Sequence, residues 1–525
     1  MYKRIIALVL SLVMVLALCS CGQNTDEPNN DSNSNQSIYV GDGISLACNT
    51  ADSFNPYKAA TELNRLLCSL LYDSLILLDN EYNAVNVLAE SITTENNVCT
   101  VKLKRTQFSD GTTLTAEDVV YSYNLAKASS GYSGRLSSIT QATVESADTI
   151  KFKCNRYDAY MVNLLTFPII KRGSDLLKNE DNVELPPIGC GKYILNSDLS
   201  GLTVNSAHHS GEATVKSVRL INTPDEEALS HAIEIGAVDM YYTDLSDCNI
   251  LRMSGDRVNT VLNNLVYIGI NLENSVLENN YMRHALSAAL DRQKICEDAY
   301  YTNAVAATGV FNPAWKAIKG IQSIQTTSKS EISIANFKKI GYNKTNNAGF
   351  LVNANNDVIA LQLLVNSENA FRNNAAKLIA EHLAAVGIKI NIVSVPYNQY
   401  VARLENKQFD LYLAETNIND NMDLAPLLCS GGAIAYGIPT ENKTATENTT
   451  EQTDSAVTLT QVINGFYSGK NTVSDIAAMA VSEMPIIPVC YRTGILFCGS
   501  EISEPSVNSI GNIYGALNAL TLNEK

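Results

Sequence analysis

Residue types that mark many catalytic and metal-dependent proteins are scarce in this 525-residue chain. It contains five histidines and one tryptophan, Trp315. No Gly-x-Ser-x-Gly sequence occurs, which excludes the nucleophile turn of α/β hydrolases. The adjacent His208 and His209 have no carboxylate or thiol at metal-ligand spacing in the sequence. We therefore expect a solvated histidine pair in a loop and no metal site.

A nucleotide-dependent enzyme is not indicated either. The segment 465–471, GFYSGKN, is one residue shorter than a phosphate-binding loop and ends in Asn where that loop has Ser or Thr. The paired carboxylates Glu226 and Glu227 stand at a predicted helix start, where negative charge favours the helix dipole. The sequence thus predicts no enzyme and no cofactor.

Basic residues are fewer than acidic residues in this chain. Lysine and arginine number 38 against 54 aspartates and glutamates, and the net charge is -16 at pH 7. So acidic a surface argues against nucleic acid as a partner. It is compatible with a protein that works beside an anionic membrane without adhering to it.

No apolar run after the first residues is long enough to span a membrane. At the N-terminus, Lys3 and Arg4 precede the apolar residues 5–18, interrupted by Ser11. This run is shorter than the ~20 residues of a spanning helix and is typical of a secretory signal. It ends in Leu18-Cys-Ser-Cys21, which resembles a bacterial lipobox. The resemblance implies a signal peptide over residues 1–20 and a lipid on Cys21; an ordinary signal peptide or an uncleaved anchor is the alternative.

Aliphatic and aromatic residues are absent from residues 22–37, GQNTDEPNNDSNSNQS. Such a segment cannot bury enough surface to offset the entropy of ordering it. We therefore expect a disordered tether over residues 21–37, between an anchor and a folded body.

Twelve cysteines are present, but their spacing is wide and no Cys-x-x-Cys pair occurs. Cys19 would leave with the signal peptide and Cys21 would be acylated. The other ten stand mostly in apolar stretches, and a chain this long needs no disulfide framework. We interpret them mainly as small buried hydrophobic residues, with one or two bridges that the sequence does not assign.

Strands and helices alternate along the chain, which is typical of an α/β fold. Cys99, Val101 and Leu103 alternate with polar residues and predict a half-buried strand. Thr115 predicts a helix cap, with Asp118 three residues later completing a capping box. Further strands are expected over 37–46, 215–222 and 237–242, and helices over 59–71 and 225–235.

From residue 359 onward the pattern is strand, helix, strand, helix, strand. A buried strand, ALQLLV, precedes an apolar helix stripe from Phe371 to Val386, which Gly387 ends. A strand with Ile388, a helix over 397–406 and a strand over 409–413 follow. We expect a parallel α/β domain, in which ligands bind beyond the carboxyl ends of the strands.

Several segments, in the same order, resemble the family 5 extracellular solute-binding proteins of ABC transporters, the oligopeptide, dipeptide and nickel class. The strongest match is residues 108–122, FSDGTTLTAEDVVYS, a turn followed by a capped helix that we interpret as structural. The supporting matches are Phe54–Pro56, Leu71–Leu75, Leu88–Glu90, Pro187–Tyr193, Ile270–Asn271, Met282–Arg292, Gly387–Ile388 and Phe409–Asp410.

The resemblance implies an α/β fold: a two-lobed periplasmic-binding-protein-like clamp with an additional small α+β subdomain. Lobe I would comprise residues 38–78, 186–270 and 479–525. The extra subdomain would comprise 79–185, and lobe II 271–478. The ligand would lie in the cleft between the lobes, with hinge closure around it.

The resemblance also implies where ligand would bind. In peptide-binding members, a Trp and then an Asp follow the strand that matches residues 409–413, and that Asp meets the ammonium group of the peptide. This chain has no Trp there, so either Asp420 or Asp423 is the counterpart, or both are solvated. A buried carboxylate at this place would have to be paired. The expected ligand-binding residues are Ser53, Asn55, Trp315, Glu415, Asn417, Asp420 and Asp423, with a core role as the alternative for Trp315.

The function implied is that of a substrate-binding lipoprotein of an ABC importer. It would capture a small solute, most plausibly short peptides, and deliver it to membrane permease subunits. The protein would be an extracytoplasmic monomer, lipid-anchored to a bacterial cell membrane. Two alternatives are a peptide-sensing receptor lipoprotein on the same fold and a binder of a nickel chelate.

Overall fold

The computed structural model describes residues 43–211, 213–321, 324–440, 457–500, 502–518 and 520–522. The expected signal peptide, the tether and Cys21 lie outside these residues. Within them, no helix has both the length and the apolar character needed to cross a bilayer.

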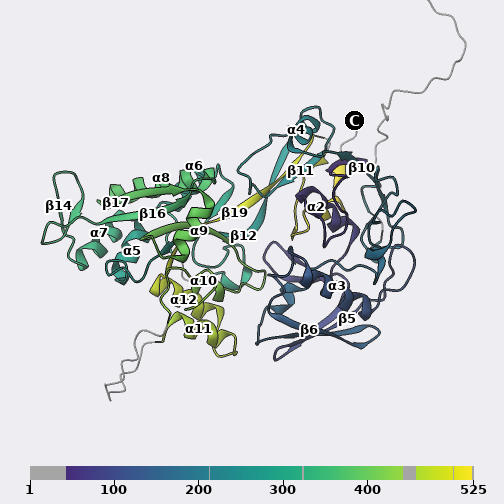
Figure 1. Cartoon of the computed structure of the whole chain (residues 1–525), viewed down its shortest axis with the longest axis horizontal. Helices are drawn as coiled ribbons and strands as arrows, with labels where there is room; N and C mark the ends of the chain where they lie inside the picture. Colours follow the sequence, from purple (N-terminus) through teal and green to yellow (C-terminus); the bar gives the residue numbers. More distant parts are fainter. Residues whose placement is uncertain are drawn as a thin grey trace, which may run out of the picture. The chain divides into compact units, whose positions relative to one another are not determined.

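The predicted βαβ segment forms one end of an eleven-stranded sheet (Figure 1). There, β16 (Ala360–Asn366) pairs in parallel with β17 (Lys389–Val395) and with β18 (Leu411–Asn417). The connecting helices are α8 (Ala370–Ala385) and α9 (Tyr397–Glu405). The parallel arrangement expected from the alternating pattern is therefore confirmed.

The other end of the sheet contains a second parallel group. Strand β1 (Gly43–Cys48) pairs in parallel with β10 (Ser217–Asn222) and with β11 (Met240–Thr243). The edge is completed in antiparallel fashion by β9 (Gly201–Val204) and β8 (Tyr193–Leu195).

Two long antiparallel strands join these groups. Strand β12 (Asp256–Ile270) pairs with β18 on one side and with β19 (Ile486–Cys498) on the other. Strand β19 also pairs with β11, and the short β13 (Ala304–Ala306) adds to it. The sheet is therefore mixed, which the strand pattern after residue 359 did not predict. The register of the β12–β19 pairing shifts between Val261 and Leu265, and again between Val266 and Tyr267.

A separate four-stranded antiparallel sheet lies in the segment 89–154 (Figure 1). Its order is β4 (Ala89–Glu95), β5 (Val98–Leu103), β7 (Thr149–Cys154) and β6 (Ile139–Ser146). The predicted alternation is confirmed, because Cys99, Val101 and Leu103 are all buried.

Helix α3 (Ala116–Ala128) begins with the predicted capping box. The Asp118 carboxylate accepts hydrogen bonds from the backbone N–H (2.9 Å) and the hydroxyl (2.7 Å) of Thr115. Ahead of it, Asp110 accepts from the backbone N–H of Thr112, and Gly111 has φ +81°. The segment 108–118 is thus the turn and capped helix that the sequence predicted.

Several element boundaries differ from the predictions by a few residues. Helix α2 (Glu62–Leu71) begins later than expected because Thr61 has extended dihedrals and accepts from the backbone N–H of Asn64 at 3.3 Å. The strand expected over 237–242 begins at Met240, and the one expected over 409–413 runs from Leu411 to Asn417. The remaining helices are α4 (Glu226–Glu234), α5 (Asn280–Ala289), α6 (Arg292–Asp298), α7 (Ser330–Lys339), α10 (Ala425–Leu428), α11 (Leu459–Phe466) and α12 (Val473–Glu483).

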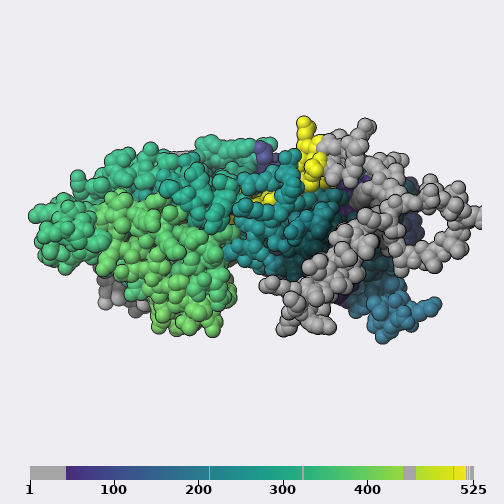
Figure 2. All heavy atoms as spheres, turned by 90° about the horizontal axis from the view of Figure 1, so that it is seen from above, coloured from purple at the N-terminus to yellow at the C-terminus, as the bar shows by residue number. Residues whose placement is uncertain are grey.

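Short antiparallel pairings complete the described chain: β2 (Ile76–Asp79) with β3 (Ala84–Asn86) and β21 (Ser509–Ile510), β14 (Lys344–Thr345) with β15 (Leu351–Val352), and β20 (Ile502–Ser503) with β22 (Thr521–Leu522). In the space-filling view, the green segment that holds β16 to β18 lies to the left of the teal segment that holds β10 and β11 (Figure 2).

The cysteines differ from the sequence expectation. Ten lie in the described residues, none of these ten forms a disulfide bridge, and nine are buried. The expectation of one or two disulfide bridges is therefore wrong for this part of the chain. The ten behave as small apolar side chains of the core instead.

Candidate functional site

The loop after β1 holds the first two expected ligand-binding residues, Ser53 and Asn55. The Ser53 hydroxyl accepts from the backbone N–H of Asn55 at 3.0 Å, and the Asn55 side chain accepts from the N–H of Tyr57 at 2.9 Å. Asn55 is buried and Ser53 is partly exposed. Both side chains therefore shape a turn, and Ser53 is the more accessible of the two.

Asp52 makes this loop rigid. Its carboxylate accepts from the hydroxyl of Thr61 at 2.6 Å and from three backbone N–H groups, those of Ser53, Ala60 and Thr61. Burial raises the pKa of Asp52, but these hydrogen bonds lower it by more, so the net shift is downward. A fixed, ionised carboxylate thus ties the loop to the start of α2.

At the end of β18, Glu415 and Asn417 enter a polar network that is buried at Arg492 and exposed at Asn417. Glu415 pairs with Arg492 of β19, with Nε and Oε1 2.7 Å apart, and also accepts from the side-chain amide of Asn264 at 2.8 Å. Asn417, which is exposed, donates to the carbonyl oxygen of the Asn264 side chain at 2.7 Å. Both expected residues lie on β18, and Asn264 of the neighbouring strand β12 contacts each of them.

Arg492 belongs to this network and, like Asn264, was not among the residues expected from the sequence. Its side chain is 5% exposed, and its Nη1 donates to the backbone carbonyl of Asp244 at 2.6 Å. Burial lowers its pKa, but the Glu415 carboxylate raises it by more, so the net shift is upward and Arg492 is charged. A lone arginine inside the apolar run IIPVCYRTGILFC was the available signal.

Asp420 and Asp423 are both paired with arginines of the segment that contains the four-stranded sheet. Asp420 contacts Arg135 at 2.5 Å, and Asp423 contacts Arg156 at 2.5 Å. Both aspartate side chains are more than four-fifths buried, so each needs a charge partner. The two arginines are those partners, and the pairing that the sequence led us to expect is thus met within the chain itself. Arg135 and Arg156 lie in loops that flank β6 and β7, and nothing in their sequence surroundings marked them.

Tyr467 completes the Asp423 pair. Its hydroxyl donates to the carboxylate at 2.6 Å, and the guanidinium carbon of Arg156 lies 3.4 Å from the centre of its ring. Next to this cluster is a groove of about 410 Å³, whose lining includes Arg156, Asp423 and the loop 429–433. The arrangement offers both positive and negative groups to a polar solute.

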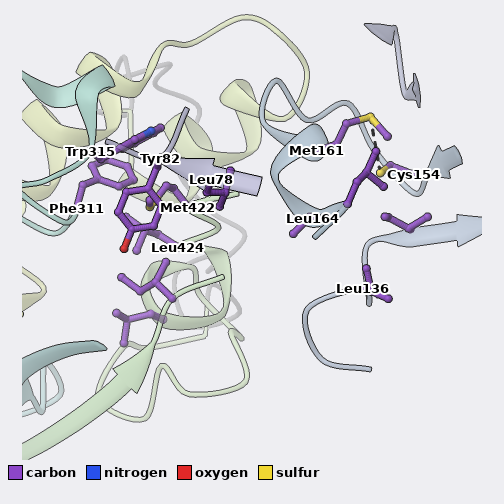
Figure 3. Close-up of a cluster of buried hydrophobic side chains, with 14 of the residues drawn as sticks. Leu78, Tyr82, Leu136, Cys154, Met161, Leu164, Phe311, Trp315, Met422 and Leu424 are labelled. Atoms are coloured by element: carbon purple, nitrogen blue, oxygen red, sulfur yellow. Dashed lines mark hydrogen bonds between the residues drawn. The ribbon is translucent and has the colours of Figure 1, made fainter. Parts of the chain in front are cut away.

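Trp315 is packed in the interior, with an exposed fraction of 2%. Its ring centre lies 4.9 Å from that of Tyr160 and 5.1 Å from that of Phe311. Figure 3 shows Trp315 and Phe311 beside Tyr82 in a hydrophobic cluster. In this conformation Trp315 contacts core side chains.

The histidine pair corrects a further expectation. The Nε2 atoms of His208 and His209 lie 2.9 Å and 3.0 Å from the same carboxylate oxygen of Asp73. The prediction of a solvated pair without a carboxylate partner is therefore wrong. Asp73 precedes the pair by 135 residues, and only the fold brings them together.

The comparison with known families decides the identity of the chain. Residues 83–432 match the model of the bacterial extracellular solute-binding proteins, family 5 middle region. This protein belongs to that family. The resemblance seen in the sequence is thus confirmed.

Curated relatives of this solute-binding protein are distant. It is 24% identical to the oligopeptide-binding protein AppA of Bacillus subtilis over 434 residues, which cover 78% of this chain and 79% of AppA. It is also 24% identical to the peptide transport periplasmic protein SapA of Salmonella typhimurium, over 81% of this chain and 83% of SapA.

Solved structures show the fold of the solute-binding protein. The unliganded open form of MppA, a periplasmic murein tripeptide binding protein, matches with a TM-score of 0.73 at 16% identity, over 92% of this chain and 98% of MppA. A nickel ABC transporter structure from Bacillus halodurans matches with a TM-score of 0.71 at 17% identity, over 90% of this chain and 98% of that one. The fold is a mixed α/β periplasmic-binding-protein fold with small additional antiparallel sheets.

Family membership also sets the class of activity. The chain is a substrate-binding component of an ABC transporter and not an enzyme. The polar networks at Arg492 and at Asp423 are therefore candidates for binding and not for catalysis.

Proposed function

We propose that this solute-binding protein captures short peptides in a cleft between two lobes and delivers them to the permease of an ABC importer. The supporting observation is the network of Glu415, Arg492 and Asn417, which joins the end of β18 to β19. Charged and amide groups held on rigid strands suit the backbone and the charged ends of a peptide. The names of AppA and SapA, both peptide binders, agree with this ligand class.

The proposed lobes follow the expected residue ranges. Lobe I comprises residues 38–78, 186–270 and 479–525, the extra subdomain comprises 79–185, and lobe II comprises 271–478. Strands β12 and β19 pair with strands of both proposed lobes, so they are the natural hinge. Closure of such lobes around a ligand is a known mode of hinge motion.

A thermal-shift screen of the chain from residue 22 onward tests the ligand. Because a ligand that binds only the folded state stabilises it by mass action, a binding di- to pentapeptide raises the melting temperature in proportion to log concentration. The Asn417→Ala variant should lose most of this shift. The matched control Asn406→Ala, an exposed amide that bonds only within α9, should keep it. If no di- to pentapeptide shifts the melting temperature, the peptide proposal is wrong.

A nickel chelate is the second candidate ligand, because the Bacillus halodurans structure of the same fold is described as a nickel ABC transporter. The same screen includes nickel with histidine. A shift by the chelate alone, without any peptide shift, would favour this candidate. A peptide-sensing receptor is the third candidate, and failure to stimulate peptide uptake with its permease would favour it.

We also propose that a lipid on Cys21 tethers the mature monomer to the outer face of a bacterial cell membrane. The support is the signal-like start of the chain and the polar segment 22–37. In the Cys21→Ala variant, the protein should appear in the medium or remain as an unprocessed precursor. Unchanged membrane retention of that variant would rule the anchor out.

A further inference from the structure

We propose that Asp73, His208 and His209 form a binding site for a divalent transition-metal ion, separate from the residues proposed for the solute. Each residue presents one ligand atom, and the three atoms lie within 4.8 Å of one another. Both imidazoles turn the same atom, Nε2, toward the same carboxylate oxygen. Three convergent ligand atoms around one centre are what a metal ion requires.

The fold holds these residues in place. Asp73 follows α2 almost directly, and the histidines lie in the loop between β9 and β10. Asn205 anchors that loop, because its side chain donates to the carbonyl of Gly191 at 2.9 Å and its backbone N–H donates to that of Lys192 at 2.9 Å. The His208, His209 and Asp73 side chains are only 5%, 14% and 15% exposed. Their positions are thus fixed before any ion arrives.

The donor set selects the class of ion. Two imidazole nitrogens and one carboxylate suit Zn²⁺, Ni²⁺ or Co²⁺, whereas Mg²⁺ and Ca²⁺ prefer oxygen ligands alone. In a tetrahedral zinc site with bonds of about 2.0 Å, ligand atoms are about 3.3 Å apart. The observed 2.9 Å and 3.0 Å require only a small outward movement. The fourth position would be left for water or an external ligand.

Protons rearrange when the ion binds. Without an ion, the backbone N–H of Ser210 donates to Nδ1 of His208 at 3.2 Å, so a neutral His208 carries its proton on Nε2 and donates it to Asp73. Metal binding needs the Nε2 lone pair, and the proton moves to Nδ1. The Ser210 hydroxyl, 3.0 Å from Nδ1, can then accept it, which is the outer partner that metal-bound histidines usually have.

The ammonium of Lys192 is a positive charge close to the proposed site. It donates to the Ser210 hydroxyl at 2.8 Å, and that hydroxyl in turn contacts Nδ1 of His208. This positive charge weakens the attraction of the site for a cation, but it does not lie between the three ligand atoms.

Calorimetric titration of the metal-stripped chain from residue 22 onward, made without a histidine tag, tests the site with Zn²⁺ as the probe. We expect one equivalent to bind and Co²⁺ to give the intense visible absorption of tetrahedral coordination. The double substitution His208→Gln and His209→Gln should weaken Zn²⁺ binding at least tenfold. The matched control His231→Gln, an exposed histidine of α4, should bind as the unaltered chain does.

A second measurement covers the case in which the double variant does not fold. Zn²⁺ should protect His208 and His209, but not His231, from modification by diethyl pyrocarbonate, as read by mass spectrometry of the unaltered chain. Absence of Zn²⁺ binding, or binding that leaves both histidines unprotected, overturns the proposal. These outcomes are independent of the peptides in the thermal-shift screen.

Discussion

Several ionised side chains of the binding networks are largely buried, and each is paired with a residue from a distant part of the sequence. Arg492 and Glu415 are 77 positions apart in sequence, and their side chains are 5% and 13% exposed. Taking two charges out of water costs several kcal/mol per ion before the pairing recovers it. The pair is therefore weak support for stability as such, but removal of one partner leaves the other charge buried alone.

The Arg492→Met variant should accordingly lose about 3–5 kcal/mol of unfolding free energy. The double variant Arg492→Met with Glu415→Gln should lose less than the sum of the single losses, because no uncompensated charge remains. Urea unfolding gives these values. Lys294→Met, which breaks the exposed pair with Asp298, is the control and should leave the unfolding free energy almost unchanged. Additive effects in the double variant would contradict this account.

At the scale of elements, helix α2 begins with an unusual carboxylate. A glutamate in the first turn of a helix is normally stabilised by the dipole. Burial of Glu62 and the nearby Asp244 carboxylate outweigh that effect and raise its pKa to about 7. The folded state thus holds this proton more tightly than the unfolded chain does.

The stability of the fold should therefore depend on pH through Glu62. A raised folded pKa contributes stability that is complete below about pH 4.5 and is lost as the pH rises to about 7. Glu62→Gln should stabilise the protein by about 2–3 kcal/mol at pH 8 and hardly at all at pH 4. Chemical unfolding at both pH values measures the difference. Glu227→Gln, an exposed first-turn glutamate of α4, should show none; a similar gain at both pH values for Glu62→Gln would contradict the shift.

Elements whose causes are local were predictable from sequence. The capping box of Thr115 and Asp118 and the alternating burial of β5 each depend on residues a few positions apart. The mixed sheet was not predictable in the same way, because β12 and β19 meet across more than two hundred residues. The same holds for the site: Glu415 and Asn417 were expected, but their partners Arg492 and Asn264 become neighbours only through strand pairing.

At the scale of the whole molecule, none of the ten described cysteines forms a disulfide, and the large core makes disulfides unnecessary for stability. Burial raises the pKa of the thiols of Cys48 and Cys99 to about 11 and that of Cys154 to about 12. The thiolate is the reactive form of cysteine. These thiols are therefore unreactive for two reasons: they are buried, and they stay protonated. Cys248 is the partly exposed exception.

A thiol count checks this distribution. In the chain from residue 22 onward, one thiol should react quickly with Ellman's reagent in the folded state, and all ten should react after denaturation. Cys248→Ser should remove the fast reaction, whereas Cys48→Ser should leave it unchanged. A count of eight in the denatured, unreduced protein would reveal a disulfide.

The position of β19 also determines when the molecule can fold. This strand, residues 486–498, is the partner of both β11 and β12, and all thirteen of its residues are buried. The large sheet is therefore incomplete until residues 486–498 have joined it. Because contacts between segments so far apart in sequence form slowly, we expect the pairing of β19 with β11 and β12 to be a late step of folding.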